Sequence, residues 1–210
     1  MTGATGSVIH HERSVHVQIV YTFTRVAVTV RRWFEIGTAA EMEHGARLEL
    51  ALLAQQPHRG TESAAQRTVV DQTFWRADIF GRLDRPDAPY SAAHFHSRFD
   101  GVEPCGREWS GDLTANPWAW LTDQLEHLED RLAGAGFDPG LAADDGNDLR
   151  ELVPRIVASA RELGPEVPLT RDEEFRLTRD AAERVRRMLD IVEDQTRIDR
   201  EHIAPWLQQV

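Results

Sequence analysis

Apolar and polar residues alternate over much of the first hundred positions of the chain. This alternation predicts strands, because successive side chains of a strand point to opposite faces of a sheet. Near Thr24 the apolar set moves from odd to even positions, which indicates a turn or a β-bulge there. The linker 84–89 predicts a wide hairpin between the last two strands. We predict five strands in all, at about residues 15–23, 26–30, 46–53, 67–83 and 92–99.

After residue 100 the apolar residues recur at steps of three and four, which is typical of amphipathic helices. Asn116-Pro117 is a strong helix start, and Gly134 is expected to cap the same helix at its end. Thr170 and Glu173 form a capping box at the start of the longest helix. We predict three helices, at 116–134, within 147–163, and from 170 to about 197. The predicted fold class is α+β, an N-terminal antiparallel sheet of about five strands followed by three amphipathic helices.

The same patterns divide the chain into three parts. Residues 1–14 are small and polar and are expected to form a flexible tail. Residues 15–115 are expected to form an antiparallel β domain that carries the candidate site. Residues 116–210 are expected to form a helical region that packs on the sheet or forms a small bundle. The last helix favours packing within the chain, with a homo-oligomer through this C-terminal helix as the alternative.

The composition excludes several classes of function. The chain has 24 basic and 35 acidic residues, a net charge of −11, which argues against non-specific nucleic-acid binding. All basic residues other than histidine are arginine, so a Schiff-base lysine and a P-loop lysine are excluded. The single cysteine, Cys105, excludes an internal disulfide framework. The sequence shows no membrane-spanning stretch and no signal peptide, so we expect a cytoplasmic protein.

Two predicted strands carry the candidate chemistry. Arg76 and Asp78 alternate with apolar residues in strand 67–83, and His94, His96 and Arg98 do so in strand 92–99. If the two strands pair as a hairpin and turn their apolar residues toward one core, these five polar residues share the opposite face. The same argument adds other residues to this face: Arg47 and Glu49 from the third strand, more weakly His16 and Gln18 from the first, and the aromatic Phe74 and Phe80.

Such a face suits three kinds of chemistry. His94 and His96 suit one divalent metal ion, with Asp78 or Glu49 as third ligand. A histidine oriented by Asp78 suits general-base catalysis, with arginines holding an anionic group. Arginine and histidine side chains also suit binding of a small anionic ligand without a reaction. The competing interpretation is an ordinary solvated sheet face.

These alternatives lead to a functional hypothesis. We expect a soluble protein that binds a ligand or a protein partner, with Arg76, Arg98, Arg47 and Glu49 as ligand-binding residues of the polar face. The alternative is a hydrolase or metal-dependent enzyme that uses His94, His96 and Asp78. If the protein is an enzyme, we expect segment 100–115 to cover this face. Elsewhere, His44 and His127 are expected on the surface, and Trp118 and Trp120 are expected to fix the first helix on the sheet.

Overall fold

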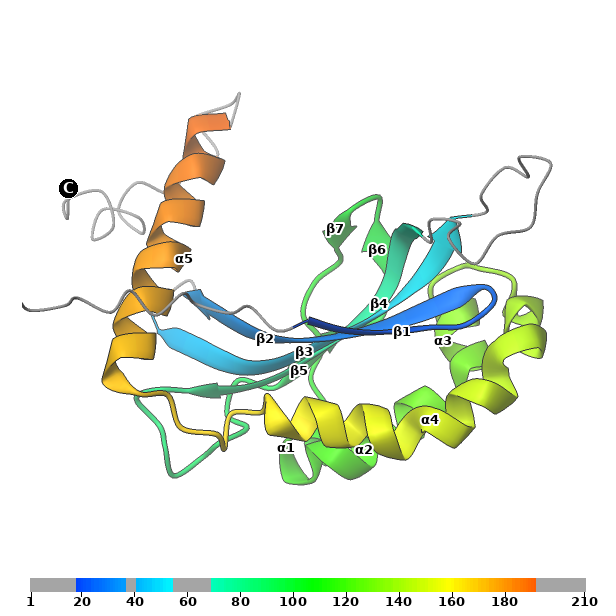
Figure 1. The fold of residues 1–210 in the computed structure, drawn as a ribbon, viewed down its shortest axis with the longest axis horizontal. Coiled ribbons are helices and arrows are strands. Elements are labelled where there is room, and N and C mark those ends of the chain that lie inside the picture. Colours follow the sequence, from blue (N-terminus) through cyan, green and yellow to red (C-terminus); the bar gives the residue numbers. More distant parts are fainter. Residues whose placement is uncertain (1–17, 37–40, 55–68, 192–210) are drawn as a thin grey trace, which may run out of the picture.

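The computed structural model of the chain describes residues 18–36, 41–54 and 69–191. The first five strands form one antiparallel sheet, in which neighbouring strands follow one another in sequence (Figure 1). The strands are β1 (Gln18–Thr22), β2 (Val26–Ile36), β3 (Met42–Ala54), β4 (Val69–Arg82) and β5 (His94–His96). A two-stranded ribbon, β6 (Phe99–Asp100) and β7 (Glu103–Pro104), follows. The turn at Thr24 joins β1 to β2, which explains the change in phase of the apolar positions.

The helices follow the strands, as the sequence predicts, so the fold class is α+β. They are α1 (Gly111–Ala115), α2 (Pro117–Glu126), α3 (Leu128–Gly134), the 3₁₀ turn η1 (Pro139–Leu141), α4 (Ala142–Glu162) and α5 (Arg171–Ile191). Asn116 caps α2 by accepting a hydrogen bond from the Ala119 amide, and Thr170 and Glu173 form the predicted capping box of α5. The predicted tail 1–14, His16 and residues 192–210 lie outside the described residues.

The predicted helix 116–134 is interrupted at His127, so it forms two helices. His127 has a non-helical backbone, with φ −114° and ψ 59°, and its ring nitrogen Nδ1 contacts the carbonyl of Asp123. Gly134 is the last residue of α3 rather than its cap. The left-handed backbone falls at Gly136, which has a φ of 84°.

Helices α2, α3 and α4 pack on one face of the sheet and share a hydrophobic core with it (Figure 1). The rings of Trp120 and Trp75 stack with centroids 6.0 Å apart, as expected for a tryptophan that fixes a helix on the sheet. The hydroxyl groups of Tyr21 and Ser159 hydrogen-bond at 2.8 Å and join β1 to α4. The core residues include Val28, Val30, Leu48, Leu50, Ala77, Leu121, Leu125, Leu149 and Val153.

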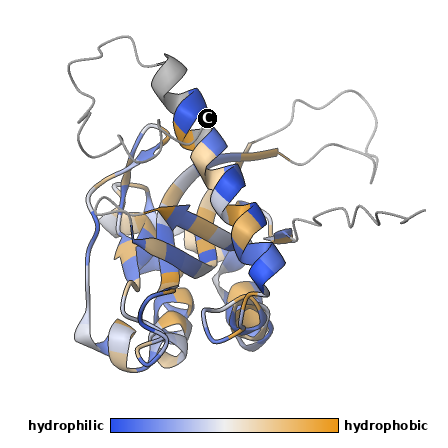
Figure 2. Cartoon of the chain, turned by 90° about the vertical axis from the view of Figure 1, so that its left-hand side faces the viewer, coloured by the Kyte–Doolittle hydropathy of each residue, from blue (hydrophilic) through white to orange (hydrophobic). Residues whose placement is uncertain are grey.

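Helix α5 packs against β2 at one end of the sheet, and hydrophobic and hydrophilic residues alternate along it (Figure 2). Near this end His44 is buried, with 5% of its surface exposed, so the expectation of a surface histidine is wrong. Burial, together with the charge of Arg32, lowers the pKa of His44 to about 4.

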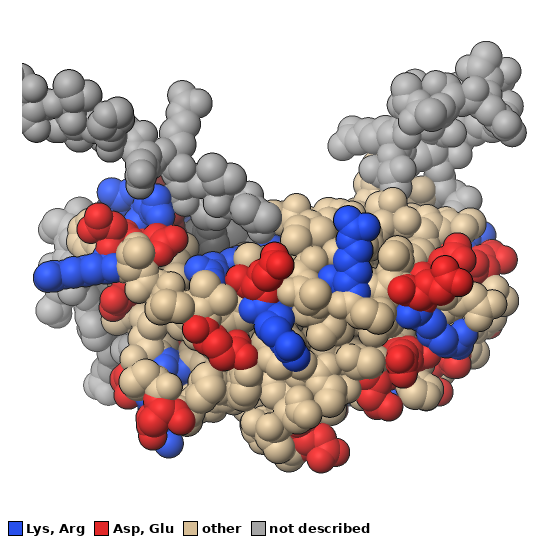
Figure 3. All heavy atoms as spheres, turned by 60° about the horizontal axis from the view of Figure 1, so that its bottom comes forward, with Lys and Arg blue, Asp and Glu red and all other residues tan. Residues whose placement is uncertain are grey.

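The helix-covered side of the molecule carries acidic and basic side chains interspersed over a largely uncharged surface (Figure 3). Within the described ranges, no helix combines the length and the apolar character that crossing a bilayer needs.

Candidate functional site

The strand register gathers the candidate residues on the sheet face opposite the helices. Asp78 pairs with His94 and Arg76 pairs with His96 across β4 and β5. On the other side of β4, Arg47 of β3 pairs with Asp78. Side chains at paired positions point to the same face, so these five residues form a single group. We call Arg47, Arg76, Asp78, His94 and His96 the polar cluster.

The remaining predicted residues lie outside the polar cluster. Glu49 pairs with Arg76 in the register, and its carboxylate accepts a hydrogen bond from Arg31 at 3.1 Å. Gln18 is exposed in the edge strand β1. Arg98 follows the end of β5 and is exposed, because the strand stops at His96 instead of continuing to residue 99.

The two aromatic residues predicted for this face, Phe74 and Phe80, lie on opposite faces of the sheet. The Phe80 ring meets the His94 ring edge-on, with centroids 6.0 Å apart, so Phe80 lies beside the polar cluster. The Phe74 ring instead contacts Phe137 at 5.8 Å and belongs to the core under the helices. The prediction for Phe74 is therefore wrong. A register shift at Leu50 and Ala51 of β3 adds one residue to β4 and reverses the side to which Phe74 points.

The polar cluster is buried rather than solvated. Asp78 is fully buried, and His94 and His96 have 1% and 4% of their surface exposed. Segment 97–109 folds back along β5 through paired backbone hydrogen bonds between Phe95 and Glu108. From this segment, Trp109 places its ring 6.4 Å from that of His94. The face therefore differs from an ordinary solvated sheet face.

Asp78 is the electrostatic centre of the polar cluster. Arg47 donates hydrogen bonds from Nε to Oδ1 at 2.6 Å and from Nη2 to Oδ2 at 3.1 Å. Arg76 Nε lies 3.0 Å from Oδ2 in an ion pair without hydrogen-bond geometry. Burial alone would raise the pKa of Asp78, but the positive charges of Arg47 and Arg76 hold it well below its usual range. Asp78 is therefore a carboxylate.

The neighbouring groups decide how the two imidazoles present their nitrogens. The Nδ1 atoms of His94 and His96 lie 2.8 and 2.6 Å from the carbonyl oxygens of Ala92 and Cys105. A carbonyl oxygen only accepts hydrogen bonds, so both Nδ1 atoms carry a hydrogen. In the neutral tautomer, each Nε2 then has a lone pair.

Both Nε2 atoms face the same carboxylate oxygen. Asp78 Oδ2 lies 3.3 Å from Nε2 of His94 and 3.7 Å from Nε2 of His96. Nε2 of His96 accepts a hydrogen bond from Arg76 Nη2 at 2.9 Å, because a guanidinium only donates. Nε2 of His94 is buried and has no hydrogen-bond partner among the described residues.

These three atoms form a potential metal-binding group. One ligand atom from each of Asp78, His94 and His96 lies within 4.8 Å of the other two. Three acceptor atoms in a buried space repel one another unless a proton or a metal ion lies between them. A donor set of two imidazoles and one carboxylate is typical of zinc and non-haem iron sites.

Several residues next to the polar cluster were missed by the sequence analysis. Glu35 accepts a hydrogen bond from Arg47 at 3.0 Å and contacts Arg107, and the Arg47 guanidinium lies 4.2 Å from the centroid of the Trp33 ring. The predicted second strand ended at residue 30, whereas β2 continues to Ile36. Extending the alternation beyond Arg31 would have placed Trp33 and Glu35 on the same face.

Comparisons with models of protein families, with characterised proteins and with solved structures find no match to this chain.

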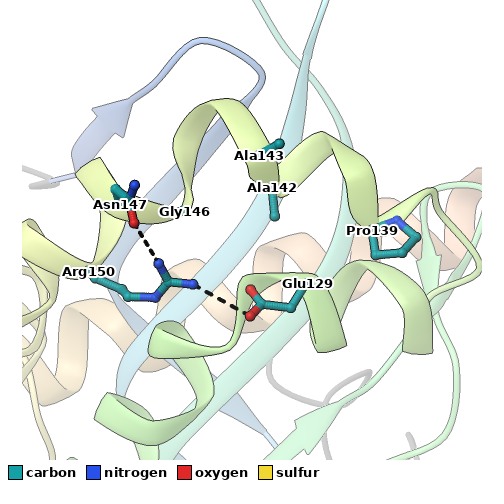
Figure 4. A pocket seen from close by; sticks show the side chains of 7 residues that line it. All are labelled: Glu129, Pro139, Ala142, Ala143, Gly146, Asn147 and Arg150. Carbon is teal, nitrogen blue, oxygen red and sulfur yellow. Dashed lines mark hydrogen bonds and ion pairs between the residues drawn. The ribbon is translucent and has the colours of Figure 1, made fainter.

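A pocket of about 370 Å³ lies between α3 and α4, on the helical side of the sheet (Figure 4). Arg150 extends across it and contacts Asn147 Oδ1 at 2.9 Å and Glu129 Oε1 at 3.5 Å. The charge of Arg150 is thus already paired, and the sheet separates this pocket from the polar cluster. The polar cluster is the better candidate for function.

Proposed function

We propose that this protein binds one divalent transition-metal ion through Oδ2 of Asp78 and the Nε2 atoms of His94 and His96. The observation that carries the proposal is the convergence of three buried acceptor atoms, one of them without a hydrogen-bond partner. An unsatisfied buried polar atom costs about 1–3 kcal/mol. A metal ion would satisfy Nε2 of His94 and would bind the other two acceptor atoms as well.

The distances support a tetrahedral or similar ion. Ligand atoms about 2.0–2.2 Å from a tetrahedral metal lie about 3.3–3.6 Å from one another. Asp78 Oδ2 lies 3.3 and 3.7 Å from the two imidazole Nε2 atoms, which is close to this range. The carbonyl groups of Ala92 and Cys105 would hold the rings in the tautomer that a metal needs, a common arrangement around metal-binding histidines.

Metal titration of the apoprotein tests the proposal. Protein stripped with a chelator is titrated with Co²⁺ and separately with Zn²⁺, and bound metal is measured after dialysis by plasma mass spectrometry. We expect about one equivalent in the wild type. The His94→Ala/His96→Ala variant should bind none. Substitution His127→Ala removes an exposed imidazole between α2 and α3 and should leave binding unchanged.

Two results would refute the proposal. One is a wild-type protein that takes up no metal, and the other is a double variant that binds as much as the wild type. Circular dichroism of the double variant shows whether a loss of binding comes with an intact fold. If it unfolds, Asp78→Asn, which keeps the size of the side chain, takes its place.

A metal-dependent hydrolase is the second candidate function. Three protein ligands leave at least one coordination position for water or substrate, as in catalytic zinc sites. Comparing metal-loaded wild type with metal-free protein on ester and phosphodiester substrates tests this candidate. Equal rates with and without metal would refute it.

A further inference from the structure

Arg76 occupies a position that a bound metal ion needs. Its Nη2 atom donates to Nε2 of His96 at 2.9 Å, and this is the lone pair that would bind the metal. Arg47 differs, because three hydrogen bonds to Asp78 and Glu35 hold its guanidinium in place. Metal binding would therefore leave Arg47 where it is and free one end of Arg76.

The released end of Arg76 would remain in a mostly buried position. Its side chain is 13% exposed and its guanidinium lies 5.8 Å from the Phe99 ring centroid. Nη2 would then lack an acceptor, which is costly for a charged donor away from water. The dication would also add two positive charges next to the guanidiniums of Arg47 and Arg76, whose charges Asp78, Glu35 and Glu49 already balance.

An oxyanion resolves both problems. We propose that the metal centre takes an oxyanion as its exogenous ligand, a carboxylate or a sulfate- or phosphate-like group. One oxygen would complete the coordination of the metal and another would accept a hydrogen bond from Arg76. Arginine suits this role because its planar guanidinium matches the spacing of oxyanion oxygens. The inference rests on the proposed metal binding and adds the chemical class of the ligand.

Positive coupling between metal and oxyanion follows. The oxyanion would accept the hydrogen bond that Arg76 loses when the metal binds, and the metal ion would supply positive charge that attracts the oxyanion. Each should therefore tighten the binding of the other by the same factor. Coupling between sites is commonly about 5- to 150-fold in affinity. Removal of the Arg76 charge should tighten metal binding without oxyanions, because the competitor for His96 is gone, and it should abolish the coupling.

The experiment is a Co²⁺ titration followed by visible absorption. The apoprotein is titrated in chloride buffer and then in acetate and in sulfate at equal ionic strength, which separates carboxylates from sulfate-like anions. For the wild type we expect Kd to fall at least fivefold in one of the two oxyanions. Arg76→Gln should bind more tightly than wild type in chloride and show no oxyanion effect.

The matched control is Arg82→Gln. Arg82 lies on the same face of β4 but pairs with Asp84 near the surface, so this variant should behave like wild type. Absence of Co²⁺ binding in every buffer would overturn the proposed function and this inference with it. Binding with one Kd in all buffers, or an undiminished oxyanion effect in Arg76→Gln, would overturn the inference alone. If Arg76→Gln does not fold, the comparison of wild-type Kd values in chloride, acetate and sulfate tests the inference.

Discussion

Substitution Asp78→Asn tests whether the polar cluster is as buried and as tightly paired as the structure shows. The variant keeps the size of the side chain but removes the carboxylate that both Arg47 and Arg76 contact. Breaking a buried ion pair by removing one partner costs about 3–5 kcal/mol. Glu35 still contacts Arg47 at 3.0 Å in the variant. We therefore expect the free energy of unfolding to fall by an amount near the lower end of this range, about 3 kcal/mol.

Urea unfolding of the metal-free protein at pH 7, followed by tryptophan fluorescence, measures this loss. The matched control is Asp84→Asn, which breaks an exposed pair with Arg82 and should change the free energy of unfolding little. The double variant Arg47→Gln/Asp78→Asn removes both buried charges and should recover part of the loss. If Asp78→Asn is no less stable than the Asp84 control, Asp78 is not the paired, buried carboxylate described above.

Two further predictions concern the scaffold. Asp145 is buried in α4 and accepts hydrogen bonds from the three backbone amides of residues 24–26 at 2.7–2.9 Å. Asp145→Ala should therefore lower the free energy of unfolding by about 3 kcal/mol, and an unchanged melting temperature would contradict this role. For His44, the folded pKa of about 4 lies below the usual 6.5, so the unfolded state binds more protons between these values. The free energy of unfolding should therefore fall by about 1–2 kcal/mol as pH drops from 6.5 toward 4, after allowing for screening by solvent. Urea titrations of His44→Leu should lack this part of the pH dependence.

Local periodicity accounts for what the sequence alone could predict. The alternation of side chains along a strand depends on nearest neighbours in the chain, so it assigned Arg76, Asp78, His94 and His96 to one face. The capping signals at Asn116 and Thr170 also act within a few residues, and the structure has both. The α+β order of strands and helices follows from the same local patterns.

The tertiary structure decided the features that depend on distant contacts. A register shift opposite β3 turned Phe74 toward the helices, and the end of β5 at His96 left Arg98 outside the polar cluster. The adjacent apolar residues Phe74 and Trp75 interrupt the alternation, but Ile79 and Phe80 do so without a register shift, so the pattern alone does not locate the shift.

The burial and the tautomers of the two histidines were likewise decided by tertiary contacts. Segment 97–109 folds back along β5 and supplies the Cys105 carbonyl, which fixes one imidazole in the tautomer suited to a metal. The sequence by itself determined that Arg76, Asp78, His94 and His96 share a face. The packing of distant segments determined that this face is closed, because burial depends on what lies above a side chain in space and not on its neighbours along the chain.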